Sequence, residues 1–131
     1  MITPIYAALL TPILVFLILR VVKLRKLHKI GLGDGDNMDL IRAVRAHGNF
    51  VETTPWVLIL MTLLDIQGGN TYIMHFVGLA LLIGRLCHLY AIHKGTVKLR
   101  TAGMMLTMTS MMVAGLYNFW IAVLVNVPIE P

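Results

Sequence analysis

The chain has 131 residues, of which 58% are hydrophobic and 13% charged, and its formal net charge is +5. Soluble globular proteins have about 45–50% apolar and about 25% charged residues, and a domain this small leaves much of its surface exposed. The composition therefore excludes a soluble globular domain, a disordered chain and a coiled coil. The single cysteine, Cys87, excludes an intramolecular disulfide. We expect an all-α integral membrane protein with one domain over residues 1–131.

Four stretches are long enough to cross a membrane, since a spanning helix needs about 20 mostly apolar residues. They cover about 2–21, 39–64, 71–92 and 101–127. Because the basic residues follow the first stretch instead of preceding it, we interpret that stretch as an uncleaved anchor and not a signal peptide. The sequence predicts a four-transmembrane-helix bundle.

The polar segment 31–39 follows the first predicted helix. Its Gly and Asp content is typical of a turn. Asp34, Asp36 and Asp39 resemble part of a calcium-binding loop, but the bidentate glutamate of such loops is missing. We interpret the segment as a turn that ends in a helix cap from Asn37 or Asp39.

The basic residues lie in or beside two predicted connections, 22–38 and 93–100, while the termini and the second connection have none. By the positive-inside rule these two connections face the cytoplasm and both termini face outward. A basic surface for nucleic acid is the competing interpretation, but topology explains the charge, so we expect no nucleic-acid partner. The basic residues are Arg20, Lys23, Arg25, Lys26, Lys29, Arg42, Arg45, Arg85, Lys94, Lys98 and Arg100.

Polar side chains share one face of the second predicted helix. Arg42, Arg45, Asn49 and Glu52 are spaced three, four and three residues apart, which places them in a stripe roughly 80° wide. A charged residue at the centre of a membrane helix costs about 2.5–3.5 kcal/mol. Such residues pair, face the bundle interior or mark a functional site.

Counting from the membrane surface places Glu52 and Arg85 at matching depths of roughly 10 Å on neighbouring helices. One interpretation is a buried ion pair between them that only joins two helices. Desolvation makes such a pair a costly source of stability, and it gives Arg45 and Asn49 no reason to share that face. We therefore favour a polar ligand pocket, which His88, three residues after Arg85, also faces.

The fourth predicted helix begins at Arg100 and Thr101. A helix N-terminus carries a partial positive charge and free N–H groups, and an adjacent Arg stabilises a thiolate there. The simpler interpretation is an interfacial arginine that obeys the positive-inside rule. The whole constellation suits a ligand with several anionic groups and one ammonium. Glutathione fits this description, as do other small zwitterions.

The histidines offer a metal site as a further alternative. His75, His88 and His93 do not have the i, i+4 spacing of ligands on one helix face, and Cys87 is alone. Structural zinc needs four ligands at characteristic spacing. We therefore expect no metal.

Three motifs resemble those of the MAPEG family, membrane-associated proteins in eicosanoid and glutathione metabolism. The run 42–55, RAVRAHGNFVETTP, resembles the family signature of an Arg followed by Asn, Glu and Pro at fixed steps. The run 84–88, GRLCH, resembles the Arg-x-x-His motif of the third helix, and 98–101, KLRT, resembles the start of the fourth. The short length and tight loops resemble a bacterial, microsomal-glutathione-transferase-like branch.

The resemblance implies a homotrimer in the bacterial cytoplasmic membrane, with glutathione bound between subunits near the cytoplasmic face. It implies that Arg100 and Thr101 lie beside the sulfur as catalytic residues. Arg25 would reach the site from the neighbouring subunit, although Lys23 and Lys26 are equally near. The other residues implied to bind glutathione are Arg45, Asn49, Glu52, Arg85 and His88.

The function implied is that of a glutathione transferase or peroxidase, whose thiolate attacks lipophilic electrophiles or hydroperoxides. Several catalytic family members carry a Tyr seven residues after the third-helix Arg, where this chain has Ile92. Tyr90 points about 140° away from Arg85 on a helix. A non-catalytic relative that binds a lipid or a partner is therefore the alternative. A small multidrug transporter is disfavoured, because such proteins carry their membrane Glu in the first helix.

Overall fold

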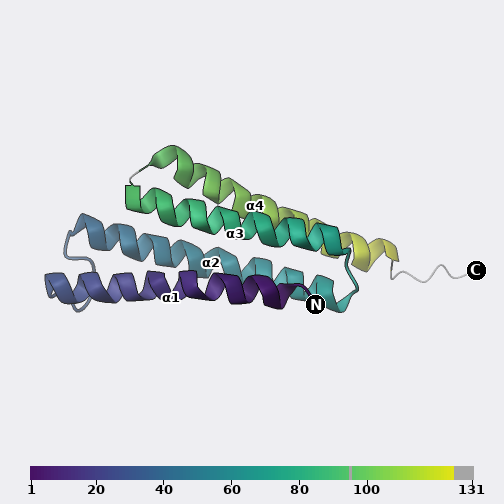
Figure 1. The fold of residues 1–131 in the computed structure, drawn as a ribbon, viewed down its shortest axis with the longest axis horizontal. Coiled ribbons are helices and arrows are strands. Elements are labelled where there is room, and N and C mark those ends of the chain that lie inside the picture. Colours follow the sequence, from purple (N-terminus) through teal and green to yellow (C-terminus); the bar gives the residue numbers. More distant parts are fainter. Residues whose placement is uncertain (95, 126–131) are drawn as a thin grey trace, which may run out of the picture.

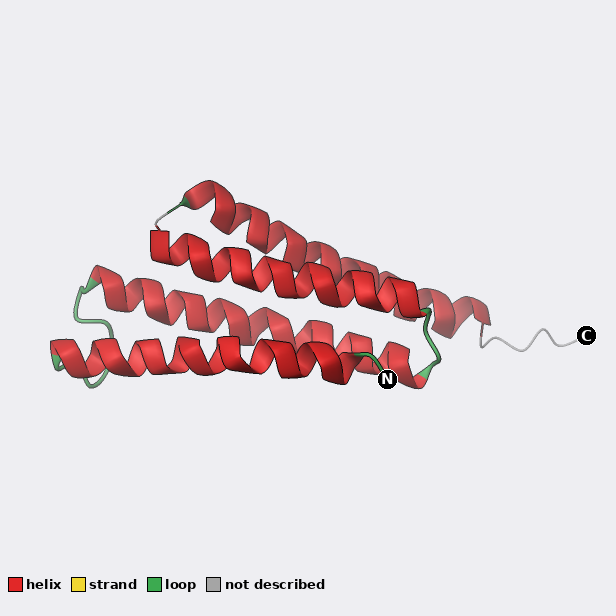
Figure 2. Cartoon of the chain, in the orientation of Figure 1, coloured by secondary structure: helices red, strands yellow, loops and turns green. Residues whose placement is uncertain are grey.

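The structure is a computed structural model that describes residues 1–94 and 96–125. It has four α-helices, α1 (Thr3–His28), α2 (Met38–Ile66), α3 (Thr71–Lys94) and α4 (Val97–Trp120), and α4 continues into a short π-helical segment, η1 (Ile121–Val125). All four are long and apolar enough to cross a membrane. Helices and loops make up the whole of the described chain (Figure 2). The predicted all-α, four-helix membrane fold is confirmed.

The four helices run side by side along the long axis of the molecule (Figure 1). The α1–α2 and α3–α4 connections lie at one end, which we call the basic end because the basic residues flank these connections. The N-terminus and the α2–α3 connection lie at the opposite end. The closest packing is between α3 and α4.

All four helices extend beyond the predicted bounds, two of them by more than two residues. Helix α1 continues to His28 instead of ending near residue 21, and α4 begins at Val97 instead of residue 101. The prediction ended each helix where the apolar residues end, but backbone hydrogen bonding continues beyond the hydrocarbon. Long Lys and Arg side chains permit this, since their stems cover apolar surface while the charged ends reach water. The predicted end of the fourth helix, residue 127, lies outside the described residues.

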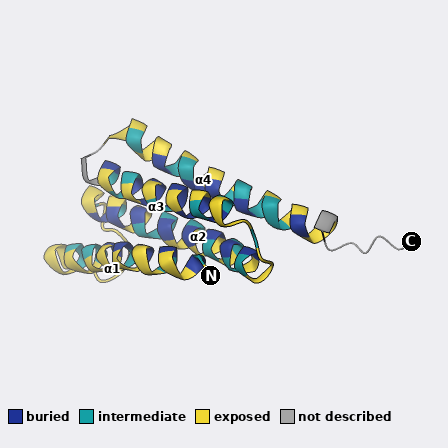
Figure 3. Cartoon of the chain, turned by 45° about the vertical axis from the view of Figure 1, so that its right-hand side comes forward, coloured by how far each residue is buried: buried dark blue, intermediate teal, exposed yellow. Residues whose placement is uncertain are grey.

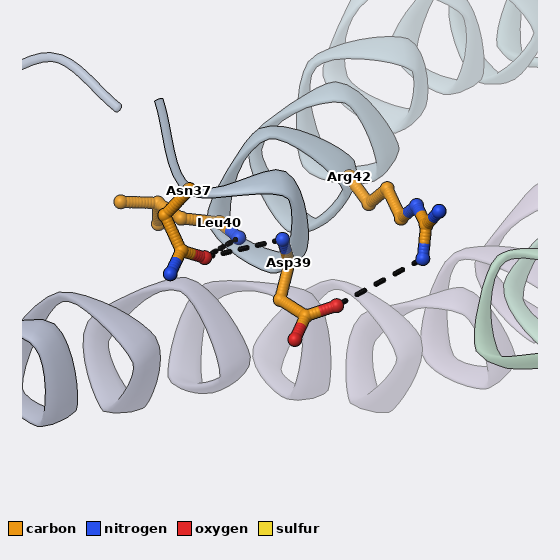
Figure 4. A network of polar contacts seen from close by, with 4 residues as sticks. All are labelled: Asn37, Asp39, Leu40 and Arg42. Atoms are coloured by element: carbon orange, nitrogen blue, oxygen red, sulfur yellow. Dashed lines mark hydrogen bonds and ion pairs between the residues drawn. The ribbon is translucent and has the colours of Figure 1, made fainter. Parts of the chain in front are cut away.

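The connection between α1 and α2 is a turn, as predicted, and Asn37 caps α2 (Figure 4). The Asn37 Oδ1 accepts hydrogen bonds from the backbone N–H groups of Asp39 and Leu40, at 3.1 and 3.0 Å. These bonds satisfy two of the N–H groups that a helix start leaves free. Of the two cap candidates, Asn37 is therefore the one used, while Asp39 pairs with Arg42 at 3.9 Å.

Buried residues follow the inner faces of the helices, and exposed ones cover the outer faces (Figure 3). Many large apolar side chains are among the exposed ones, including Phe16, Trp56 and Phe119. A hydrophobic outer surface of this extent suits contact with lipid tails, because hydrocarbon imposes no penalty on exposed apolar groups.

Glycines allow α3 and α4 to approach very closely. A Cβ atom on Gly103 would lie 2.6 Å from the Gly84 carbonyl oxygen, and one on Gly84 would lie 2.9 Å from the Gly103 carbonyl oxygen. Small residues at a membrane helix interface bring the two backbones together in this way. The contact places Thr107 of α4 beside Arg85 of α3, and so builds part of the site.

Candidate functional site

A cavity of about 800 Å³ opens between α2, α3 and the start of α4, at the basic end. Its volume lies within the range of about 300–1,000 Å³ that small-molecule sites have. The apolar part of its wall includes Ile92 and Met104. The polar side chains of its wall are Arg42, Arg45, Asn49, Glu52, His88, Thr96 and Arg100.

Helix α2 supplies most of these polar groups because its polar stripe faces the cavity. The stripe was predicted from helical spacing, and the structure brings all four of its members to one wall: Arg42, Arg45, Asn49 and Glu52. His88 of α3 and Arg100 of α4 lie on the other walls. The structure thus gathers five of the eight predicted site residues around one cavity.

Arg85 lies behind this wall and does not line the cavity. It is the largest of the fully buried side chains, with 2% of its surface exposed. Its Nη1 donates to Asn49 Oδ1 at 2.6 Å and to Thr53 Oγ1 at 3.4 Å. Its Nη2 donates to Thr107 Oγ1 at 2.5 Å. Arg85 therefore joins α3 to both α2 and α4.

The predicted possibility of a Glu52–Arg85 ion pair is wrong for this chain. The ion pair found among the described residues is Asp39–Arg42, and Glu52 is exposed. Depth along the helices had suggested the pair, but direction around α2 decides the partner. Asn49 and Glu52 point about 60° apart around the helix axis, and the Asn49 side chain is the one that meets Arg85.

The guanidinium of Arg85 is thus a buried charge held by three neutral oxygens. Its Nε has no hydrogen-bond partner among the described residues. Buried charges are usually paired with an opposite charge, because removing a charge from water is expensive. With Arg42, Arg45 and Arg100 nearby on the wall, and Glu52 the single carboxylate there, the region has an excess of positive charge.

Asn49 connects Arg85 to the cavity. Its Oδ1 accepts from Arg85, and its Nδ2 donates to the Met104 sulfur at 3.0 Å. A thioether is a weak acceptor. The amide N–H of Asn49 therefore lies in the cavity wall with a partner that a better acceptor could replace.

The two predicted catalytic residues, Arg100 and Thr101, differ in their positions. Because α4 begins at Val97, Arg100 lies at the end of the first turn and its N–H already donates to the Thr96 carbonyl. The free N–H groups of the helix start belong to residues 97–99. Arg100 lines the cavity, whereas the exposed Thr101 is absent from the wall and its hydroxyl donates to the Val97 carbonyl at 3.2 Å.

Arg25 does not line the cavity of its own chain. Its Nη1 donates to the carbonyl oxygens of Gly33, Ile30 and Gly31, at 2.9, 3.4 and 3.4 Å. It therefore holds the α1–α2 connection against the end of α1. Its predicted reach into a neighbouring subunit stays a prediction.

Sequence reasoning missed Thr53, Met104 and Thr107. A threonine in a membrane helix is commonly read as a neutral residue whose hydroxyl bonds back to its own helix. One signal could have found Thr107: it follows Gly103 by four residues, and two small residues at that spacing mark a close helix contact. Nothing in the sequence pairs Met104 with Asn49.

Comparison with known proteins shows which family of proteins this chain is similar to. Residues 3–120 match the model of the MAPEG family. The chain is 35% identical over 120 residues to the inner membrane protein YecN of Escherichia coli strain K12, covering 92% of each chain. The protein of the same name from Escherichia coli O6:H1 strain CFT073 matches equally. No solved structure matches.

Proposed function

Because this chain belongs to the MAPEG family, we propose that it binds glutathione and activates the thiol for attack on lipophilic electrophiles or hydroperoxides. The chain is a multi-pass membrane protein with four helices able to span a bilayer. Its relatives are bacterial inner membrane proteins. A hydrophobic second substrate reaches such a protein through the bilayer.

The observation that carries the proposal is the charge pattern of the cavity. Its wall combines the cations Arg42, Arg45 and Arg100 with one carboxylate, Glu52. Glutathione has two carboxylates, one ammonium and one thiol. The arginines suit the carboxylates, since guanidinium groups form strong charge-assisted hydrogen bonds with them, and Glu52 suits the ammonium. The amide of Asn49 offers a further N–H donor.

Arg100 is the group that we expect to activate the thiol. Free thiols have a pKa of about 8.5, and a nearby positive charge favours the thiolate. The start of α4 adds its partial positive charge. In the transferase reaction the thiolate sulfur bonds to an electrophilic carbon, and the leaving group departs with its electron pair.

In the peroxidase reaction the sulfur attacks the terminal oxygen of a hydroperoxide. The O–O bond breaks, an alcohol leaves and glutathione becomes a sulfenic acid. A second glutathione converts that species to glutathione disulfide and water. Neither reaction requires a nucleophile from the protein.

A homotrimer is part of the proposal. Arg45 and Glu52 are exposed in the isolated chain although they belong to a membrane-spanning helix. Contact with lipid would make this arrangement costly, and a neighbouring copy that covers the polar face of α2 removes the cost. Native mass spectrometry of the purified protein measures this state, and a monomer would contradict it.

Calorimetric titration of the purified protein with glutathione tests the proposed function. We expect the wild type to bind and Glu52→Gln to bind about 10- to 100-fold more weakly, because a hydrogen bond between charged groups is lost. Arg45→Ala should weaken binding similarly. Lys98→Ala is the matched control, since Lys98 is exposed and absent from the cavity wall. A folded wild type that does not bind glutathione would overturn the proposal.

A non-catalytic binding protein is the second candidate, and one observation favours it. Ile92 forms part of the cavity wall and offers no hydroxyl to a sulfur atom. Tyr90 is 56% exposed and is not part of the wall. Conjugation of glutathione to 1-chloro-2,4-dinitrobenzene separates the candidates. A transferase loses this activity in Arg100→Ala, whereas a protein that only binds shows none in the wild type.

A further inference from the structure

Arg85 affects the cavity only through its neighbours, because its own side chain is buried behind the wall. Three oxygens from α2 and α4 accept its hydrogen bonds. The bond to Thr107 fixes the far side of the guanidinium, and the bond to Asn49 fixes the side nearest the cavity. The position of one partner therefore constrains the other through a planar, rigid group.

The hydroxyl of Thr107 is fixed as an acceptor for Arg85. A threonine hydroxyl has a single hydrogen, and that of Thr107 is donated to the Gly103 carbonyl oxygen at 3.0 Å. Its lone pairs are therefore left to accept from Arg85 Nη2. The same close helix contact holds the hydroxyl near α3, since a Cβ atom on Gly84 would lie 3.0 Å from Thr107 Oγ1.

The orientation of the Asn49 amide follows from this arrangement. Because Oδ1 accepts from Arg85, Nδ2 must point the other way, where it meets the sulfur of Met104 in the cavity wall. A carboxylate is a far stronger acceptor than a thioether. An anionic ligand in the cavity would take this N–H from Met104.

We propose that Thr107 is a positioning residue, which holds Arg85 so that Asn49 presents its amide N–H to a carboxylate of the ligand. The chain of contacts runs from α4 through α3 to α2. Through these contacts the buried guanidinium of Arg85 acts on the ligand without touching it. The inference rests on the proposed function for its ligand, glutathione.

Calorimetric titration with glutathione tests this inference in Thr107→Val, which replaces the hydroxyl by a methyl group of similar size. We expect binding about 10-fold weaker or more, since Asn49 would no longer hold its N–H toward the ligand and a hydrogen bond to a charged carboxylate would be lost. Thr107→Ser keeps the hydroxyl and should bind within about 2-fold of the wild type. Thr107→Ala also removes the hydroxyl but is smaller than valine, so it cannot crowd the contact with Gly84. We expect the same loss of affinity in Thr107→Ala as in Thr107→Val.

Ser110→Ala is the matched control. Ser110 is buried on the same helix, its hydroxyl donates back to the Leu106 carbonyl at 2.9 Å, and it is not among the hydrogen-bond partners of Arg85. Its loss should leave glutathione affinity unchanged. Equal losses of affinity in Ser110→Ala and Thr107→Val would overturn the inference, because they would show a general effect on α4.

A double-mutant cycle distinguishes positioning from mere stabilisation of the fold. If Thr107 acts through Asn49, then Thr107→Val should add less than about 2-fold to the loss already caused by Asn49→Ala. If the two losses of glutathione affinity simply multiply in the double variant, the two residues act independently and the inference is overturned.

Failure of this inference is distinguishable from failure of the proposed function. A folded wild type that does not bind glutathione overturns the proposed function, and this inference with it. A wild type that binds, together with a Thr107→Val variant of equal affinity, overturns only the role of Thr107.

Discussion

Arg85 is the residue on which the candidate site depends most, because it joins its own helix, α3, to both α2 and α4. Its two Nη atoms reach acceptors on opposite sides, Asn49 and Thr53 on α2 and Thr107 on α4. Such bridging requires several N–H donors in a fixed plane, which a guanidinium provides and an ammonium does not. Geometry as well as charge is therefore needed at this position.

Arg85→Lys separates the two requirements at the scale of one residue. The variant keeps the positive charge but cannot span both Asn49 and Thr107 with a planar group. We expect glutathione affinity to fall about 10-fold or more and the thermal unfolding temperature in detergent to fall as well. Calorimetry and thermal melts measure both. Wild-type affinity in Arg85→Lys would show that the charge alone suffices.

The packing of α3 against α4 sets the distances within the site. Gly84 and Gly103 lie at the closest approach, where a side chain on either would meet the backbone of the other helix. One turn beyond Gly103 lies Thr107, and one residue beyond Gly84 lies Arg85. The separation of these two helices therefore decides whether the hydrogen bond between Thr107 and Arg85 can form.

Gly103→Ala tests this dependence at the scale of the element. Its Cβ atom would lie 2.6 Å from the Gly84 carbonyl oxygen and 2.9 Å from the backbone nitrogen of His88, so the helices must separate. We expect a lower unfolding temperature and weaker glutathione binding. Gly115→Ala is the matched control on the same helix, because nothing lies within 4 Å of its added Cβ. There alanine should be neutral or stabilise by about 0.5–1 kcal/mol, and equal destabilisation by both variants would contradict the argument.

At the scale of the whole molecule, the charge bias predicts orientation. The basic end carries the Lys and Arg residues that flank both of its connections, while the α2–α3 connection at the opposite end has none. The positive-inside rule then places the basic end, and the cavity with it, on the cytoplasmic side. Glutathione would enter from the cytoplasm, and the lipophilic substrate from the bilayer.

Labelling of single cysteines in intact cells measures this orientation. In a Cys87→Ser background, we expect a membrane-impermeant maleimide to label Gln67→Cys, in the α2–α3 connection, without permeabilisation. Leu32→Cys should react only after permeabilisation, although Leu32 is 94% exposed in the protein. The Cys87→Ser parent is the unlabelled control. The reverse pattern would contradict the predicted orientation.

The sequence by itself determined the membrane class, the number of spanning helices and the polar stripe of α2. Each of these is a property of one segment, because length, hydropathy and a period of 3.6 residues do not depend on a partner. For the same reason the turn before α2 and a helix cap from Asn37 or Asp39 could be predicted from a few neighbouring residues, and the structure shows that Asn37 is the one used. The family motifs are also local runs, and the comparison with known proteins confirmed the family that they indicated.

Only the tertiary structure decided which groups meet. Depth along a helix placed Glu52 opposite Arg85. Rotation around α2 and the close approach of α3 to α4 instead make Asn49 and Thr107 the hydrogen-bond acceptors of Arg85. The start of α4 also lay beyond local reasoning, because a helix ends where its backbone hydrogen bonds end and not where its apolar residues end. The partners of a buried charge depend on three helices at once, and no single segment contains that information.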